Sequence, residues 1–436
     1  MQEKQNNFAL VWFQNNLRVQ DNALLYEIVK KHKNIIAVYC FDPRHYENTP
    51  FGFLKTGKFR TKFLIETVTN LKNNLKTLNI ELLVFNEKPE TAIKGITEKY
   101  QVEALYLQKE WTSEEVQTFN NVVKELPKSI KIHAAYDQFL YHPDDINYSA
   151  REIPKVFTNF RKNTEKTSTV RPVIKIEPLK TNAVVENKTK IPTLKTLGYA
   201  DFEMNPNTAF PFSGGETAAL ERLEYYVFKT KKLGVYKKTR NGLLGKDFSS
   251  KFSPWLANGS LSARTIFWAV KEFEKQHFKN QSTYWLVFEL MWRDYFKYIS
   301  LKHNNNIFKI DGILNNKYHW ERNQDLVEKW INGETESNFV NANMIELKKT
   351  GWMSNRGRQN VASYFSKDLK LDWRIGGAYF ESLLIDYDVH SNYGNWMYVS
   401  GVGNDPRDRK FNVNLQAQRY DASGTYQKLW LQPTLF

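Results

Sequence analysis

The sequence predicts two unlike structural halves: an α/β half built on a Rossmann-like, five-stranded parallel sheet, and an all-α half. Up to residue 136, short apolar runs alternate with segments of helical periodicity, which is typical of a parallel sheet covered on both faces. From residue 213 onward the periodicity is helical, and ten of the twelve tryptophans lie at or after Trp255. We therefore expect an α/β domain over 1–136, a connector over 137–212 and a helical domain over 213–436.

Five apolar runs in the first half have the length and composition of buried strands. They are FALVWF (8–13), NIIAVYCF (34–41), IELLVF (80–85), VEALYL (102–107) and IKIHAAY (130–136). Helices are expected between them, near 21–32, 57–78, 89–99 and 112–126. The helix over 57–78 is the clearest, because its apolar residues recur at spacings of three and four.

The segment 141–212 contains seven prolines together with many Lys, Thr and Asn residues. Proline interrupts helices and strand ladders, so we expect an ordered connector that wraps the surface with little regular structure; a flexible tether is the alternative. Ser213 and Glu216 then have the spacing of a capping box before a helix. Further helices are expected near 262–276, 282–301, 323–331, 336–350, 355–368 and 374–386.

Charge and composition restrict the class of protein. Lys and Arg outnumber Asp and Glu by 62 to 47, a formal net charge of +15. This excess favours a polyanionic partner such as nucleic acid; a diffusely positive surface is the alternative. The single cysteine excludes a disulfide framework, and scattered histidines predict no metal site. Without a membrane-length apolar run or a signal-peptide pattern, we expect a cytoplasmic protein that does not enter a membrane.

The first half lacks the common nucleotide-binding motifs. Gly52-x4-Gly57-Lys58 approximates a phosphate-binding loop, but Phe59 stands where a Ser or Thr would ligate magnesium. No G-x-G-x-x-G motif follows the first strand. A ligand of the sheet is therefore expected at the carboxyl ends of its strands.

Two features of the second half indicate a functional core. The helix over 282–301 is apolar on nearly every face, yet Glu289 and Arg293 lie one turn apart in it. They are either a buried ion pair between helices or part of a site, and we favour a site because buried charge is typical of one. Between Trp352 and Trp396, tryptophans alternate with charged residues. This mixture predicts a large, flat, redox-active ligand.

Several segments resemble the photolyase/cryptochrome superfamily, and within it most closely the cryptochrome DASH group. They are YKKTRNGLLGKDFSSKFSPWLANGSLSAR, ELMWRDYF, GWMSNRGRQN, DWRIGGAYFESLLIDYDVHSNYGNW and GVGNDPR. They occur in the family's order, and the resemblance runs from the first strand to about Pro433. It implies that the all-α half is an FAD-binding domain that holds FAD in a U-shaped form.

The resemblance also implies how the FAD is held. Hydroxyls and N–H groups of a serine-rich turn would receive the diphosphate, although a simple helix N-cap would also explain the serines. Arg358 and Asp386 would pair beside the flavin ring, and Asp388 would be an acceptor near its other edge; a pair of solvated loop acids is the alternative for Asp386 and Asp388. A neutral Asn392 would face the central ring nitrogen without imposing a charge. The residues expected to bind FAD are Tyr236, Ser249, Ser250, Lys251, Phe252, Ser253, Glu289, Arg293, Trp352, Asn355, Arg358, Asp386, Asp388 and Asn392.

Trp396, Trp373 and Trp320 match the family's electron-hopping chain from the flavin to the surface. Indole is readily oxidised and stays rigid when packed, so spaced indoles can relay an electron over a distance too long for one jump. Core packing, the usual role of tryptophan, is the alternative.

The resemblance implies light-driven repair of cyclobutane pyrimidine dimers. In photolyases, photoexcited reduced FAD passes an electron to a dimer that has left the base stack, and regains it after the dimer splits. Glu289 matches the acid that contacts the dimer, Trp292 the pocket wall, and Asn355 a polar contact. The residues expected to act in catalysis are Glu289, Asn355, Trp292, Trp396, Trp373, Trp320 and Asn392.

Two pocket positions follow the DASH pattern and differ from ordinary dimer photolyases. Gln359 stands where those enzymes have Met, and Tyr398 where they have a second pocket Trp. Both are expected to bind substrate in a pocket that is more polar and stacks a flipped dimer less well. Single-stranded DNA avoids most of the unpairing cost, so we expect repair of dimers in single-stranded DNA, with duplex DNA or RNA bound weakly. A monomer is expected.

The first half resembles the family's antenna domain. In DASH relatives, methenyltetrahydrofolate lies between the domains, and Glu110 matches the acid that contacts the pterin; a solvated acid at a helix start is the alternative. Gln14 and Asn16 stand where Arg and Asp are common in the family, and their effect on the antenna side is an open question. Two other functions also stay open: a blue-light photoreceptor with little repair activity, and a nucleic-acid-binding flavoprotein without lesion chemistry.

Overall fold

A single parallel sheet organises the first half of the computed structural model, which describes residues 7–432; Pro433, where the resemblance ends, lies outside this range. The sheet has the order β3-β2-β1-β4-β5. Its strands are β1 (Phe8–Trp12), β2 (Ile35–Cys40), β3 (Glu81–Phe85), β4 (Val102–Gln108) and β5 (Lys131–Ala135). The strand order changes direction between β1 and β4, so a topological switch point lies at their carboxyl ends. The predicted Rossmann-like sheet is confirmed.

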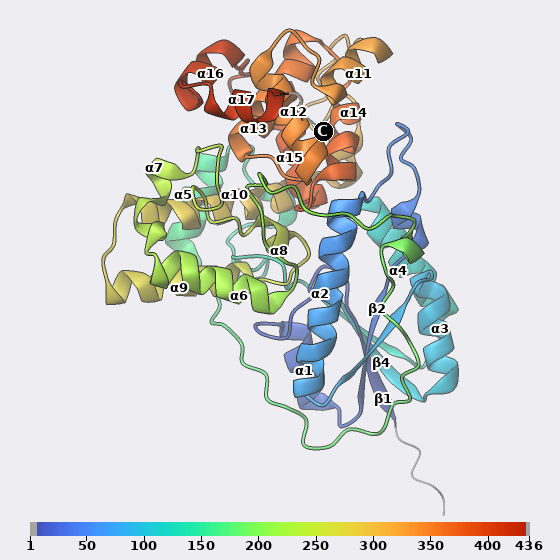
Figure 1. Cartoon of the computed structure of the whole chain (residues 1–436). Coiled ribbons are helices and arrows are strands. Elements are labelled where there is room, and N and C mark those ends of the chain that lie inside the picture. Colours follow the sequence, from blue (N-terminus) through green and yellow to red (C-terminus); the bar gives the residue numbers. More distant parts are fainter. Residues whose placement is uncertain (1–6, 433–436) are drawn as a thin grey trace, which may run out of the picture.

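Helices cover both faces of this sheet (Figure 1). On one face, α1 (Ala23–Lys31) and α2 (Lys58–Thr77) pack on Ala9 and Val11 of β1. On the other face, α3 (Pro89–Lys99) and α4 (Ser113–Glu125) pack on Leu10 and Trp12. Alternate residues of one strand point to opposite faces, which explains why the whole β1 run is apolar.

The connector follows the surface of the sheet and then joins the helical half (Figure 1). Asn187 Nδ2 donates to the carbonyl of Leu82 at 2.9 Å, and Thr189 Oγ1 accepts from the N–H of Val84 at 2.9 Å. The connector therefore covers the edge strand β3, which would otherwise expose unpaired backbone groups. One helix was not expected here, α5 (Phe157–Thr167). Helix α5 is short, and its buried face packs on α10 (Gln281–His303), which is far along the chain. The local sequence pattern was therefore too weak to predict it.

The second half is helical throughout, as predicted. Its helices are α6 (Glu216–Glu224), α7 (Tyr236–Thr239), α8 (Ser253–Ala257), α9 (Ala263–Gln276), α10 (Gln281–His303), α11 (Gln324–Asn332), α12 (Asn338–Thr350), α13 (Asn355–Ser363), α14 (Trp373–Leu383), α15 (Val389–Ser400), α16 (Val413–Tyr420) and α17 (Thr425–Leu431). The last three were not expected. The α15 sequence, VHSNYGNWMYVS, has a low intrinsic helix propensity that its tertiary packing overrides.

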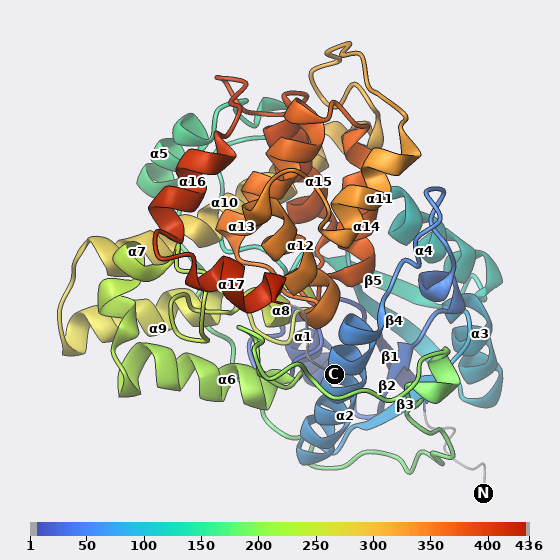
Figure 2. The same cartoon turned by 45° about the horizontal axis from the view of Figure 1, so that its top comes forward.

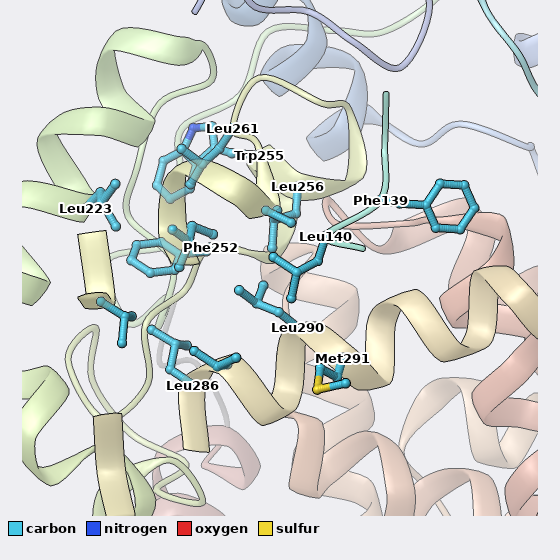
Figure 3. Packing of buried hydrophobic residues seen from close by; sticks show 14 of the residues in the cluster. Phe139, Leu140, Leu223, Phe252, Trp255, Leu256, Leu261, Leu286, Leu290 and Met291 are labelled. Atoms are coloured by element: carbon cyan, nitrogen blue, oxygen red, sulfur yellow. The ribbon is translucent and has the colours of Figure 1, made fainter. Parts of the chain in front are cut away.

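Helix α10 passes through the helical half, with α8 and α15 against it (Figure 2). Figure 3 shows Leu286, Leu290 and Met291 of α10 packed with Phe252 and Leu256 around α8. This core fixes the turn before α8, which lies at the site described below.

The predicted capping box at Ser213 and Glu216 is wrong. The N-cap of α6 is Gly215, with a φ of 104°, which favours glycine. The carboxylate of Glu216 reaches the first half instead and accepts from the N–H groups of Val19 and Gln20 at 3.0 and 2.7 Å. This side chain therefore joins the two halves and does not cap its own helix.

A buried ion cluster also joins the halves. Asp137 contacts Arg18 at 2.6 Å and Arg264 at 2.7 Å, and Arg264 contacts Asp21 at 3.0 Å. These four side chains are at most 4% exposed. Buried charges require such partners, so the cluster allows few relative orientations of the halves. Within residues 7–432, no helix is long and apolar enough to cross a membrane, and no group of three or more His, Cys, Asp or Glu residues is placed to hold a metal ion.

Candidate functional site

A cavity of about 420 Å³ opens among α7, α8, α10, α13 and α15. We call it the helical cavity. Most residues expected to bind FAD or substrate line it: Tyr236, Ser249, Ser250, Lys251, Phe252, Ser253, Glu289, Trp292, Arg293, Trp352, Asn355, Arg358, Gln359, Asp386, Asp388 and Tyr398. A side cavity of about 70 Å³ shares part of this lining and adds Asn392 and Trp396. The structure places Glu110, Trp373 and Trp320 elsewhere.

The serine-rich turn presents unused backbone donors. Arg222 donates to the carbonyls of Ser250 and Ser249 at 3.1 and 3.2 Å. Lys251 has a φ of 63°, a left-handed conformation that turns the chain sharply. Among the described residues, the N–H groups of 249–253 have no hydrogen-bond acceptor. Free N–H groups on a turned backbone suit an anion such as a diphosphate.

Charged side chains surround the middle of the cavity. Arg358 Nη2 contacts both oxygens of Asp386 at 2.9 and 3.0 Å, so this aspartate is paired and is not a solvated loop acid. The ammonium of Lys251 lies 4.7 Å from the ring centre of Trp352. Burial lowers the pKa of Lys251, with the charges of Arg222 and Arg358 adding to the effect. Lys251 and Arg358 therefore place two cationic side chains at this part of the cavity.

Asp388 is an ionised group in the wall of the cavity. Burial alone would raise its pKa, but the ammonium of Lys297 holds that pKa well below its usual range, and the guanidinium of Arg293 acts in the same direction. Lys297 Nζ contacts its Oδ2 at 2.9 Å, and the N–H of Ser391 donates to its Oδ1 at 2.8 Å as the cap of α15. The same contacts thus start α15 and fix a carboxylate at the cavity.

The orientation of the Asn392 amide is set by one contact. Nδ2 donates to the carbonyl of Gly377 at 3.0 Å, and that carbonyl can only accept. The other end of the amide, Oδ1, is therefore the end available to the side cavity, which Asn392 lines.

The alternative interpretation of Glu289 and Arg293, a buried ion pair, is excluded because each side chain has other partners. Glu289 pairs with Arg240 of the loop after α7, and burial raises the pKa of this glutamate, partly offset by the charge of Arg240. Arg293 donates to the carbonyls of Gln138 and Leu256 at 2.7 and 3.1 Å. Glu289 and Arg293 lie one helical turn apart on α10, but the hydrogen-bond partners of both side chains lie on other elements.

Aromatic side chains form the mouth of the cavity. Trp292 stacks on Phe157 of α5 with ring centres 3.7 Å apart, and its edge meets Tyr398 at 5.9 Å and 87°. Gln359 accepts from Arg356 Nη1 at 2.9 Å. The mouth therefore combines the aromatic surface of Trp292 with the polar side chain of Gln359.

Sequence reasoning missed three arginines at this mouth. Arg240 and Arg409 line the cavity, and Arg356 holds Gln359 and also donates to Asn241 at 3.2 Å. All three lie inside or beside segments quoted for the family resemblance. Their position in or beside those segments could have identified them as candidate site residues.

The three tryptophans of the expected relay belong to one core cluster. Trp396 is 2% exposed, and its indole lies against Gly376 of α14, where an added Cβ would approach within 2.2 Å. Trp373 is fully buried, and Trp320 is partly exposed. Of the three indoles, Trp396 lines the side cavity, Trp373 lies in the core and Trp320 is partly exposed. A fourth indole, Trp330, meets Trp396 edge to face at 6.2 Å.

A separate cavity of about 420 Å³ lies between the sheet and the helical half. We call it the interdomain cavity. Glu110 and Gln14 line it, at the carboxyl ends of β4 and β1. Burial raises the pKa of Glu110 to about 7, against the opposing charge of Lys297. Asn16 is fully buried, and its Oδ1 accepts from the N–H of Gln14 at 2.9 Å, so it shapes the turn.

The comparisons with known proteins agree with this arrangement. The family model described as the FAD binding domain of DNA photolyase matches residues 285–435, and the DNA photolyase model matches 9–181. A cryptochrome DASH from Gloeobacter violaceus is 44% identical over 97% of this chain and 85% of its own length. The crystal structure of a Synechocystis cryptochrome has a TM-score of 0.94 and 42% identity, and covers 98% of this chain and 89% of that one. An archaeal photolyase from Sulfolobus tokodaii, described as containing two FAD molecules with a novel light-harvesting cofactor implied, has a TM-score of 0.79 and 25% identity over 98% of this chain and 90% of its own.

Proposed function

Because the chain belongs to the cryptochrome DASH group of the photolyase/cryptochrome superfamily, we propose that it repairs cyclobutane pyrimidine dimers in single-stranded DNA under blue light. The proposal rests on the observation that the residues expected at the flavin and those expected at the substrate line the same cavity. The helical cavity is lined both by the paired Arg358 and Asp386 on its flavin side and by Glu289, Trp292 and Tyr398 at its mouth. An electron donor and a flipped base could therefore meet there.

FAD fits the residues present, and when bound it supplies the light-driven electron. The free N–H groups of 249–253 would hold its diphosphate. The pair Arg358–Asp386 would lie beside its ring, and Asn392 would offer Oδ1 as an acceptor to a ring N–H. These contacts would bind and orient the cofactor.

Glu289 would act on the substrate. Burial raises the pKa of its carboxyl, against the charge of Arg240, and this shift favours the acid form that would donate a hydrogen bond to a carbonyl oxygen of the damaged base. Trp292, held by stacking on Phe157, would present an aromatic wall to that base. Asn355 is exposed at the start of α13 and lines the same cavity, where its amide can add a polar contact.

The preference for single strands rests on the mouth of the cavity. Tyr398 and Gln359 offer less stacking surface than two large apolar side chains would, so extraction of a dimer from a duplex would be poorly compensated. Arg240, Arg356 and Arg409 would attract the phosphate backbone of either kind of DNA. Backbone attraction without strong stacking favours bases that are already unpaired.

Two further elements complete the proposal. Trp396, Trp373 and Trp320 would relay electrons from the surface to the flavin, which keeps it reduced. A folate antenna, methenyltetrahydrofolate, would occupy the interdomain cavity beside Glu110. The cytoplasmic location and the monomeric state stay predictions from the sequence.

The test is to illuminate the reduced, FAD-loaded protein with a thymine dimer placed in a single-stranded and in a duplex oligonucleotide. We expect repair in the single strand and much less in the duplex. Equal repair of both would contradict the selectivity. Flavin photoreduction without repair in either would favour the photoreceptor function.

A further inference from the structure

Trp320, the last indole of the proposed relay, has no acceptor for its indole proton. The side chain is partly exposed, but its Nε1 is buried and has no hydrogen-bond partner among residues 7–432. An indole that loses an electron becomes a cation radical, which turns into a neutral radical only when the N–H proton leaves. Because nothing receives this proton, the positive charge stays on Trp320. A charge separation that ends at Trp320 is therefore easily reversed.

A tyrosine lies in contact with this indole. The rings of Tyr318 and Trp320 meet edge to face, with their centres 5.7 Å apart at an angle of 64°. Tyr318 is 39% exposed and lies in the loop before α11. Two aromatic rings in contact can pass an electron directly from one to the other. Tyr318 is therefore placed to reduce an oxidised Trp320 from the solvent side.

Unlike the indole, the phenol of Tyr318 has an acceptor for its proton. Its Oη donates to Oδ2 of Asp408 at 3.0 Å. Partial burial raises the pKa of Tyr318, and the hydrogen bond to Asp408 and its charge act in the same direction. The phenol therefore keeps its proton at neutral pH and directs it at the acceptor. The side chain of Asp408 is 49% exposed, so water can take the proton onward.

Lys367 couples the electron of Tyr318 to its proton. Its Nζ lies 5.0 Å from the centre of the Tyr318 ring and also pairs with Oδ1 of Asp408. A cation over a ring stabilises the neutral ring but repels a positive charge formed on it. A tyrosine cation radical is therefore disfavoured here, whereas a neutral tyrosyl radical is not. The electron can leave Tyr318 readily only when the proton leaves with it.

A second tyrosine beside the relay is less well placed. Tyr393 lies 6.1 Å from Trp373 between ring centres, and its Oη is 3.4 Å from Oε2 of Glu381. Burial raises the pKa of Glu381 to about 7, so this carboxyl is about half protonated at neutral pH. A long contact to a partly protonated acceptor makes proton loss from Tyr393 slow. The geometry favours Tyr318.

We propose that Tyr318 is the terminal electron donor of the relay, giving one electron to oxidised Trp320 while its phenolic proton passes to Asp408. Trp320 returns to the neutral indole, Tyr318 becomes a neutral radical, and Asp408 becomes a carboxylic acid that releases the proton to water. A thiol restores Tyr318 by giving it a hydrogen atom, and two thiyl radicals then join as a disulfide.

This proposal rests on the proposed relay and deepens it. For the charge separation to reverse, Tyr318 would have to regain a proton together with its electron. The separated charge therefore lasts longer than it would on Trp320, which gives an external thiol time to react.

The experiment excites the oxidised, FAD-loaded protein with a blue flash in the absence of thiol. Transient absorbance follows the radical, and electron paramagnetic resonance of freeze-quenched samples identifies it. We expect a tyrosyl radical in the wild type. Tyr318→Phe keeps a ring against Trp320 but removes the hydroxyl, so it should give a tryptophan radical that decays about tenfold faster. Tyr393→Phe is the matched control and should leave the tyrosyl radical unchanged.

Asp408 has its own test. Asp408→Asn keeps an oxygen that can accept the hydrogen bond but not the proton. The tyrosyl radical should then form about a hundredfold more slowly, the lower end of the range for a positioned base. Because this change also breaks the pair with Lys367, the control is Lys367→Gln, which breaks the same pair but keeps the carboxylate. Lys367→Gln should still form the tyrosyl radical.

The outcomes separate this proposal from those on which it rests. A tryptophan radical with equal lifetimes in the wild type and Tyr318→Phe, or a tyrosyl radical that persists in Tyr318→Phe, would overturn it. A wild type that forms no radical would overturn the relay as well. Dimer repair by chemically reduced protein does not use the relay, so its failure would contradict the repair function and leave the assignment of Tyr318 standing. Melting temperatures of the variants report on folding.

Discussion

The side-chain amide of Asn392 donates to the carbonyl oxygen of Gly377 across α15 and α14 at 3.0 Å. This contact fixes which end of the amide faces the side cavity, because a carbonyl oxygen can only accept. A neutral acceptor is thus held where the resemblance places the flavin's central nitrogen.

Replacement of this residue by a carboxylate should alter both stability and redox behaviour. In Asn392→Asp the Gly377 carbonyl loses its donor, which should cost about 1–3 kcal/mol in the free energy of unfolding. The added negative charge should also make the bound flavin harder to reduce. Urea unfolding and a spectroscopic redox titration measure the two effects. An unchanged reduction potential would remove Asn392 from the flavin environment.

Trp396→Phe should retain FAD but stop photoreduction of the oxidised protein. Phenylalanine keeps most of the packing against Gly376 but is far harder to oxidise than indole. The measurement is the flavin absorbance during blue illumination with an external reductant. Trp268→Phe is the control, because that indole is 40% exposed on α9 and lies outside the cluster. Normal photoreduction in Trp396→Phe would show that electrons reach the flavin by another route.

Glu289→Gln should lower the repair yield about ten- to hundredfold, the range expected for loss of one hydrogen bond to a charged group. The amide keeps the shape of the side chain but cannot supply an acidic proton. FAD content should change little, since the other residues expected to bind the cofactor are unchanged. Repair is measured on a thymine dimer in a single-stranded oligonucleotide. Wild-type yield in this variant would exclude Glu289 from the mechanism.

Asp137→Asn should destabilise the protein by about 3–5 kcal/mol, because Arg18 and Arg264 would stay buried without their shared carboxylate. Urea unfolding monitored by tryptophan fluorescence measures the change. The exposed pair of Lys31 and Glu27 offers the matched control, and Glu27→Gln should give no measurable difference. If the urea unfolding curves of Asp137→Asn and Glu27→Gln were similar, the interdomain cluster would contribute little to the free energy of unfolding.

Folic acid affinity should rise as the pH rises through about 7. Burial raises the pKa of Glu110 to about 7, so its carboxyl is protonated below this pH and a full acceptor above it. A ligand that donates N–H groups binds the ionised form. Lys297, Glu115 and Asp388 face the same carboxyl, so Glu110→Gln is needed to isolate it. A pH profile that stays steep in Glu110→Gln would assign the titration to another group.

Much of the fold and family could be predicted from the sequence, because strands, amphipathic helices and motifs are local patterns. The five apolar runs became the five strands, and the quoted segments contain most of the cavity lining. The helices α5 and α15 could not be predicted with the same means. Their residues favour a helix only when the rest of the core packs against them.

Partners between distant residues were decided by the tertiary structure alone. Spacing predicted that Glu216 would cap its own helix and left a Glu289–Arg293 ion pair as an alternative, but both carboxylates have other partners. The interdomain cavity brings together Gln14, Glu110 and His390 from the ends of two strands and from a helix, so no sequence pattern joins them. The amino-acid sequence determines which chemical groups are present and which face of a helix or strand they occupy. The free energy of a buried charge or hydrogen bond depends instead on the atoms that long-range packing brings within about 3 Å of it.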